Sequence, residues 1–135
     1  MTGTNHGNRW TSRWPNGPEP GAFRLATLIV AVMLAWLAFR PSTGDDVGLP
    51  WDKANHCFSF VVLTVLTGCG WPRLTMVRLA AIMLAVGTGI ELVQGLPAVG
   101  RDADVWDVVA DMAGFALGRG VLMLGRRRGW TGFRE

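Results

Sequence analysis

The chain has few cysteines and few charges, and each shortage excludes a class of protein. Cys57 and Cys69 fall in one apolar run, and their spacing of twelve positions would separate them by roughly 18 Å along a helix. They therefore cannot pair, and no CxxC or Cys/His spacing indicates a metal site. Only 17% of the residues are charged, whereas 50% are apolar. This balance is unusual for a soluble domain and typical of a small helical membrane protein.

A compact basic patch with interleaved aromatic residues is also lacking, although the net charge is +3. The arginines stand instead at the ends of apolar runs, where they orient helices against lipid headgroups. We therefore expect the lipid bilayer, and not nucleic acid, as the partner of this basic chain.

Four apolar runs are each long enough to cross a bilayer, so the sequence predicts an all-α protein that forms a four-helix transmembrane bundle. The runs cover residues 23–39, 53–70, 74–96 and 105–124. They make up a membrane domain over 23–125, between a flexible N-terminal arm, 1–22, and a basic tail, 126–135. A secretory signal is the alternative for the first run, but no small-x-small cleavage site follows it.

The arginines also predict the orientation of the bundle. Most of them fall on one side of the four runs: Arg9, Arg13, Arg24, Arg73, Arg78, Arg126, Arg127, Arg128 and Arg134. The other side receives Arg40, Lys53 and Arg101 together with several aspartates. By the positive-inside rule, both termini lie in the cytoplasm.

Residues 101–118, RDADVWDVVADMAGFALG, place a polar stripe on an apolar helix. Spacings of 3, 4, 3 and 4 put Asp104, Asp107, Asp111, Gly114 and Gly118 on one face. An ionised Asp at the centre of a bilayer costs on the order of 3 kcal/mol, so this face should meet protein or water. The two glycines have the GxxxG spacing that permits close helix packing.

The second and third runs carry polar stripes of their own. Asp52 and His56 share one face of the second run, and Gly87, Glu91 and Gln94 follow an i, i+4, i+7 pattern on the third. The predicted orientation brings these ends and the start of the fourth run to the outer side. The sequence therefore predicts a cluster of ionisable residues close to the outer interface.

The second run begins Asp52-Lys53-Ala54-Asn55-His56, and the later polar residues come in the order Glu91, Gln94, Arg101, Asp107, Asp111, Gly114 and Gly118. This succession resembles the D-K-x-x-H, E-x-x-Q, R and D-x-x-x-N-x-x-G-x-x-x-G motifs of the VanZ-like family of small bacterial membrane proteins. Asp111 stands where the family usually has Asn, and Cys57 stands where an aromatic residue is common. The resemblance implies a multi-pass protein of the bacterial cytoplasmic membrane. The family takes its name from a protein linked to low-level resistance to teicoplanin.

The leading hypothesis is a binding or catalytic module for an anionic, lipid-linked molecule of the cell envelope. The candidate catalytic residues are His56, Glu91 and Asp107. Ligand binding is assigned to Asp52, Lys53, Gln94, Arg101 and Asp111, and helix packing to Gly87, Gly114 and Gly118. Arg101 suits a phosphate or carboxylate because its guanidinium binds such groups with two hydrogen bonds.

Two alternatives accompany this hypothesis. The carboxylates and the imidazole are also a ligand set for a divalent cation, with Arg101 beside it on a bound phosphate. The other alternative is a structural or accessory membrane subunit whose charged residues only set helix packing.

We further predict that Asp111 is protonated at neutral pH unless Arg101 or a cation compensates its charge. A protonated Asp111 would take the place of the Asn that the family usually has.

Overall fold

The computed structural model describes residues 19–39, 52–99 and 103–128, and this part of the chain is entirely helical apart from its turns. The four helices are α1 (Pro20–Phe39), α2 (Asp52–Gly70), α3 (Met76–Gln94) and α4 (Val105–Arg127). The predicted all-α class is confirmed. The arm up to residue 18, the loop with Asp45 and Asp46, Arg101, and the tail from residue 129 lie outside the described residues.

Local signals in the sequence set the helix ends. Thr75 caps α3 by accepting a hydrogen bond from the backbone N–H of Arg78 at 3.3 Å. Asp104 caps α4 in the same way, with the N–H of Trp106 as donor at 2.9 Å. Asp52 lies in the first turn of α2, where the helix dipole favours a carboxylate.

The helix ends that differ most from the sequence prediction, by three residues each, are the start of α1 and the end of α4. α1 begins at Pro20 and not at residue 23, because proline is tolerated in the first turn of a helix. α4 continues through Arg126 and Arg127, which the sequence analysis had placed in the tail. Arginine is a good helix former, and its positive charge is favourable in the last turn.

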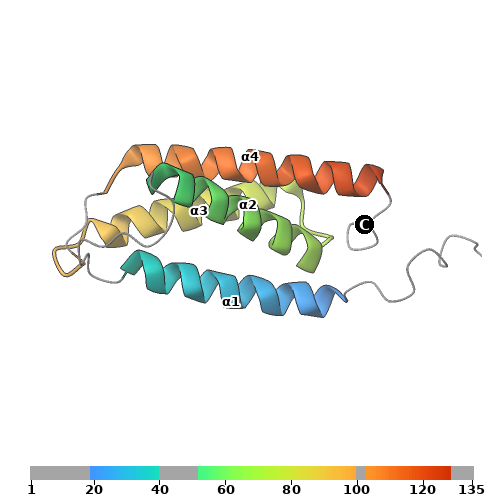
Figure 1. Ribbon diagram of the computed structural model, residues 1–135, viewed down its shortest axis with the longest axis horizontal. Helices are drawn as coiled ribbons and strands as arrows, with labels where there is room; N and C mark the ends of the chain where they lie inside the picture. The colour runs from blue at the N-terminus through green and yellow to red at the C-terminus, as the bar shows by residue number, and fades with distance from the viewer. Residues whose placement is uncertain (1–18, 40–51, 100–102, 129–135) are drawn as a thin grey trace, which may run out of the picture.

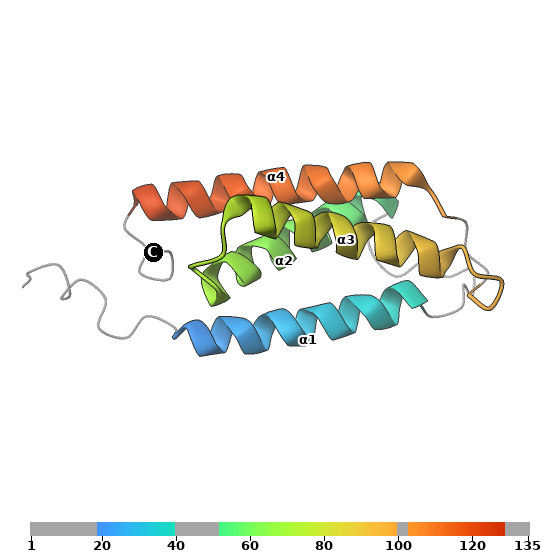
Figure 2. The same cartoon turned by 180° about the vertical axis from the view of Figure 1, so that it is seen from behind.

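The helices alternate in direction along the bundle, so α1 and α3 run one way while α2 and α4 run the other (Figure 1). The view from behind shows α1 along one side of the bundle and α3 beside α4 (Figure 2). α2 makes its most extensive packing with α4. The starts of α2 and α4 and the end of α3 therefore lie at the same end of the molecule.

Small residues allow α4 to approach its neighbours closely. A Cβ atom on Gly114 would collide with the backbone oxygen of Cys57, and one on Gly118 would lie 2.8 Å from the Cβ of Thr64. On α3, a Cβ on Gly87 would lie 2.5 Å from Oδ2 of Asp111. A side chain at any of the three positions would meet a neighbouring helix, so glycine permits the close approach observed there.

The buried apolar core is small, as expected where lipid covers the outside of a bundle. It comprises Phe60, Leu63, Cys69, Leu79, Met83 and Leu122. Cys57 and Cys69 are both free, in agreement with the sequence analysis. Thr27 is the one buried residue of α1, whereas Leu25, Leu28, Ile29, Val32, Met33 and Trp36 are exposed. An exposed apolar surface of this kind on a helix is typical of contact with a membrane or a partner.

Three of the described helices, α1, α3 and α4, are long and apolar enough to cross a membrane. The second helix does not meet that criterion, although the sequence analysis counted it as a span. Its 19 residues suffice in length, but its first half, DKANHCFSF, is rich in polar residues. Length and composition thus support three of the four predicted spans.

Candidate functional site

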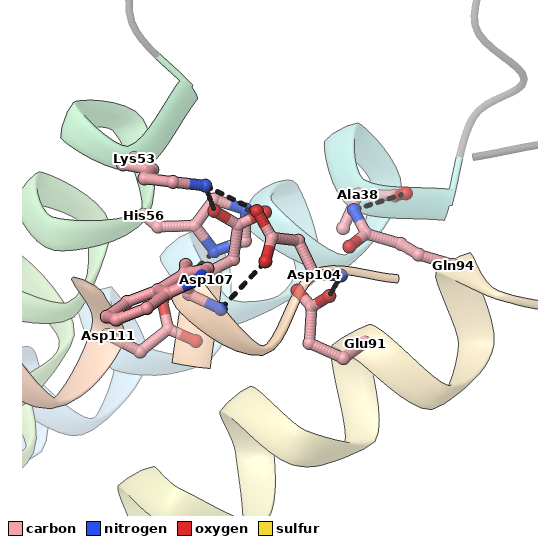
Figure 3. Close-up of polar contacts among 9 residues, drawn as sticks. Ala38, Lys53, His56, Glu91, Gln94, Asp104, Asp107 and Asp111 are labelled. Atoms are coloured by element: carbon pink, nitrogen blue, oxygen red, sulfur yellow. Dashed lines mark hydrogen bonds and ion pairs between the residues drawn. The ribbon is translucent and has the colours of Figure 1, made fainter. Parts of the chain in front are cut away.

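Ionisable side chains from α2, α3 and α4 meet at the end of the bundle where α2 and α4 begin (Figure 3). Asp107 and Asp111 face inward from the first two turns of α4 and are buried. Glu91 is buried near the end of α3, and His56 lies one turn into α2. The alternating direction of the helices places these residues at one level, as the sequence predicted.

His56 lies between two aspartates of α4. Its Nδ1 is 3.0 Å from Oδ1 of Asp111, a distance at which an Nδ1–H donates a hydrogen bond to the carboxylate. The other ring nitrogen, Nε2, is 3.8 Å from Oδ2 of Asp107, too far for a hydrogen bond. Asp111 is fully buried, and 13% of the His56 side chain is exposed. Asp111 therefore fixes the orientation of the ring, while Nε2 is left to face a ligand or a proton carrier.

Lys53 makes ion pairs with both aspartates at the start of α4. Its Nζ lies 2.6 Å from Oδ2 of Asp104 and 3.0 Å from Oδ1 of Asp107. The hydrogen bond from Lys53 lowers the pKa of Asp104, and the bond from the N–H of Trp106 acts in the same direction. These pairs tie the start of α2 to the start of α4. Sequence reasoning assigned Lys53 to ligand binding but missed both aspartate partners, which lie more than 50 residues away in the chain.

Glu91 connects α3 to the turn before α4. Its Oε2 accepts a hydrogen bond from the backbone N–H of Asp104 at 2.7 Å. Its other oxygen, Oε1, is buried and has no hydrogen-bond partner in the described part of the chain. Figure 3 shows the Glu91 side chain rising from α3 toward Asp104. Asp104 therefore caps α4, pairs with Lys53 and donates its backbone N–H to Glu91. The sequence analysis placed Asp104 on the polar stripe of the fourth run and predicted none of these contacts.

Gln94 is directed away from this cluster. Its Nε2 donates to the backbone oxygen of Ala38 at 3.3 Å, which joins the end of α3 to the end of α1 (Figure 3). The structure directs Gln94 to α1 and not to His56, and the ligand-binding role expected for Gln94 stays a prediction. Arg101, the expected anion contact, lies outside the described residues.

Asp52 is exposed in the first turn of α2, one turn before His56. Ligand atoms of Asp52, His56 and Asp107 all lie within 4.8 Å of one another, close enough for the three side chains to hold a metal ion. Asp52 was predicted as a ligand-binding residue from its place on the His56 face of the helix. Its ligand-binding role stays a prediction.

Carboxyl groups outnumber cations in this part of the described structure. Five acidic side chains, those of Asp52, Glu91, Asp104, Asp107 and Asp111, surround Lys53 and the imidazole of His56. Removing unpaired charge from water is expensive, so the excess calls for protons or a cation. The arrangement is suited to proton transfer at His56 and to cation binding, and less suited to direct contact with an anion.

Comparisons of the chain with protein-family models, with curated proteins and with solved structures find no match. The geometry of this cluster, which we call the His56 cluster (Asp52, Lys53, His56, Glu91, Asp104, Asp107 and Asp111), is therefore the basis for a functional proposal.

Proposed function

We propose that the chain is a VanZ-like multi-pass protein of the bacterial cytoplasmic membrane with both termini in the cytoplasm. α1 and α3 run in the same direction, so if both cross the bilayer, α2 has to return across it between them (Figure 1). α2 is also the helix whose polar half is covered by α4, which lowers the cost of placing that half in a membrane. The arginine distribution then places the His56 cluster at the outer leaflet.

At that position we propose that the protein binds or acts on an anionic, lipid-linked molecule of the cell envelope. The observation that supports this most strongly is His56, a histidine held by a buried aspartate with its second nitrogen turned toward Asp107. Structural hydrogen bonds between helices need only Ser, Thr or Asn, which cost less to bury than ions. His56 is the proposed acid or base, Asp111 its positioning residue, and Asp107 the carboxylate that faces the reacting group.

The alternative is a structural or accessory subunit, and one observation favours it. Lys53 already pairs with Asp104 and Asp107, and Glu91 binds the backbone of Asp104, so these groups join three helix ends. In this alternative the cluster only holds the ends of α2, α3 and α4 together and binds no ligand.

Glu91→Gln separates the two functions. A glutamine oxygen still accepts the hydrogen bond from the backbone N–H of Asp104. Glutamine cannot take up or release a proton, so the fold is retained while the candidate acid or base at this position is lost. Glu19→Gln, the same substitution at an exposed position before α1, is the matched control. We expect both variants to accumulate like the wild type, and only Glu91→Gln to lose an envelope phenotype such as altered teicoplanin susceptibility. Reduced accumulation of Glu91→Gln with no separate loss of phenotype supports the structural alternative.

A further inference from the structure

Three potential metal ligands of the His56 cluster, Asp52, His56 and Asp107, lie close together. Asp52 and His56 are separated by four residues on α2, so both project from one face of the helix. Asp107 reaches the same point from the first turn of α4. Their nearest ligand atoms lie within 4.8 Å of one another. Three side chains from two packed helices are thus already close to a common centre.

The distance between His56 and Asp107 is suited to a bridging cation. Nε2 and Oδ2 are 3.8 Å apart, too far for a direct hydrogen bond. Zinc bonds to nitrogen and oxygen of about 2.1 Å give a separation of about 3.4 Å between two ligands of a tetrahedral site. Closing the remaining gap requires only a small movement of side chains. The other oxygen of Asp107 keeps its ion pair with Lys53.

Asp111 supplies the support that a metal-binding histidine commonly has. A histidine ligand usually donates its second ring N–H to a carboxylate, which fixes the ring and leaves the other nitrogen free for the metal. Asp111 Oδ1 lies 3.0 Å from Nδ1 of His56 on the side away from Asp107. The lone pair of Nε2 then faces Asp107.

A separate observation indicates that positive charge belongs in this cluster. Glu91 is 6% exposed, yet Oε1 of its carboxyl group lacks a hydrogen-bond partner among the described residues. Glu91 reaches into the cluster from α3, opposite the two helices that carry the three ligands (Figure 3). Lys53 alone does not balance the acidic groups around it, and a bound cation supplies the missing charge.

We propose that Asp52, His56 Nε2 and Asp107 Oδ2 bind one divalent cation of the Zn²⁺ type, with Asp111 as the positioning residue. One imidazole and two carboxylates suit Zn²⁺ better than Ca²⁺, which prefers oxygen ligands alone. Three protein ligands leave a coordination position open, as in catalytic zinc sites. A phosphate oxygen of the ligand fits that position, so the inference deepens the proposed function by explaining how an acidic cluster accommodates an anion.

The test is a Zn²⁺ titration of the full chain in detergent, without an affinity tag. His6→Ala serves as the background, since His6 and His56 are the two histidines of the chain. We expect one equivalent to bind, and Ca²⁺ at the same concentration not to compete. Asp111→Asn should weaken binding by about 10- to 100-fold, and Asp52→Asn by at least as much. Asp52 is exposed, so its variant should fold normally.

Asp104→Asn is the matched control, because it removes one carboxylate from the same cluster and retains a good capping residue. Its Zn²⁺ affinity should stay close to that of the background protein. The proposal is overturned if no Zn²⁺ binds, which means that protons compensate the acidic groups. It is equally overturned if Asp52→Asn and Asp104→Asn weaken binding to the same extent, which indicates diffuse attraction. No lipid enters this titration, so the proposed lipid function can fail or hold separately.

Discussion

Oδ1 of Asp111 lies 3.0 Å from Nδ1 of His56. The Asp111 side chain is fully buried between α2, α3 and α4. The pair joins the two helices with the most extensive contact in the bundle. The same aspartate touches Gly87 of α3 with its second oxygen. One side chain therefore sets both the orientation of the histidine and the distance between two helices.

Asp111→Asn should leave the stability of the fold nearly unchanged, whereas Asp111→Ala should lower it. The asparagine oxygen still accepts a hydrogen bond from Nδ1 of His56. Alanine leaves the buried Nδ1 without a partner, at a loss of about 1–3 kcal/mol. Thermal unfolding in detergent measures the difference. Equal damage from both variants contradicts the interpretation that the hydrogen bond is the main role of Asp111 in folding.

Asp107→Asn should impair function more than Asp111→Asn does. Asp107 carries the ion pair with Lys53 and faces Nε2 of His56, so it needs its negative charge. Both variants are compared for accumulation and for the envelope phenotype in one host strain. If the two behave alike, Asp107 and Asp111 act as a pair of carboxylates with one shared role.

Gly114→Ala should destabilise the bundle, by about 1–3 kcal/mol or more. The new methyl group meets the backbone oxygen of Cys57, which cannot move aside as a flexible side chain can. Gly120→Ala is the control on the same helix, because a Cβ there has no atom within 4 Å. Alanine should leave stability at position 120 unchanged or raise it by up to about 1 kcal/mol through helix propensity. A similar melting temperature for the two variants contradicts the close packing of α4 on α2.

The ion pair of Lys53 with Asp104 should persist in moderately acidic solution. Lys53 lowers the pKa of Asp104 below its ordinary value, so the pair contributes stability above that value and loses it as the pH falls through the lowered pKa. Stability should therefore be insensitive to this pair at pH 5 and above, and decline below about pH 4. Asp104→Asn should reduce that acid-side decline, as followed by unfolding between pH 2 and pH 6. An unchanged pH profile shows that Asp104 does not contribute to it.

Thiol labelling in intact cells tests the proposed orientation. In a background with Cys57→Ser and Cys69→Ser, Asp46→Cys should react with a membrane-impermeant reagent, and Arg73→Cys should react only after the cells are opened. The reason is the excess of arginine on the side that carries Arg73. Labelling of Arg73→Cys in intact cells would place the His56 cluster on the cytoplasmic side.

Helix positions were predictable because they depend on local properties of the sequence. The apolar runs, the prolines and the capping residues fix the helices to within a few residues of their observed ends. The buried faces of α3 and α4 were also predictable, because their polar and small residues follow helical spacing. These residues are Gly87, Glu91 and Gln94 on α3, and Asp107, Asp111 and Gly114 on α4. The end of α4 was not predictable, because arginine neither breaks a helix nor requires one.

Contacts between helices were less accessible from the sequence. Spacing within a helix does not determine which residue of another helix it meets, so the partners of Lys53 and the separation of Gln94 from His56 required the three-dimensional arrangement. The cap of α4 gave a partial signal. Asp104 precedes a long apolar helix, where an aspartate is a common N-cap, and that position already argues against placing it on the helical stripe.

Native mass spectrometry of the detergent-purified full chain tests the central claim most directly. The claim is that the His56 cluster binds a lipid-linked envelope molecule and does not only join helices. The wild type and Cys57→Ser, a conservative change beside His56, should retain a phosphate-bearing lipid-linked species at one copy per chain. His56→Gln should unfold at a similar melting temperature and lose that species. If all three proteins carry the same bulk lipids and nothing else, the cluster is a structural element of the bundle and the proposed function is wrong.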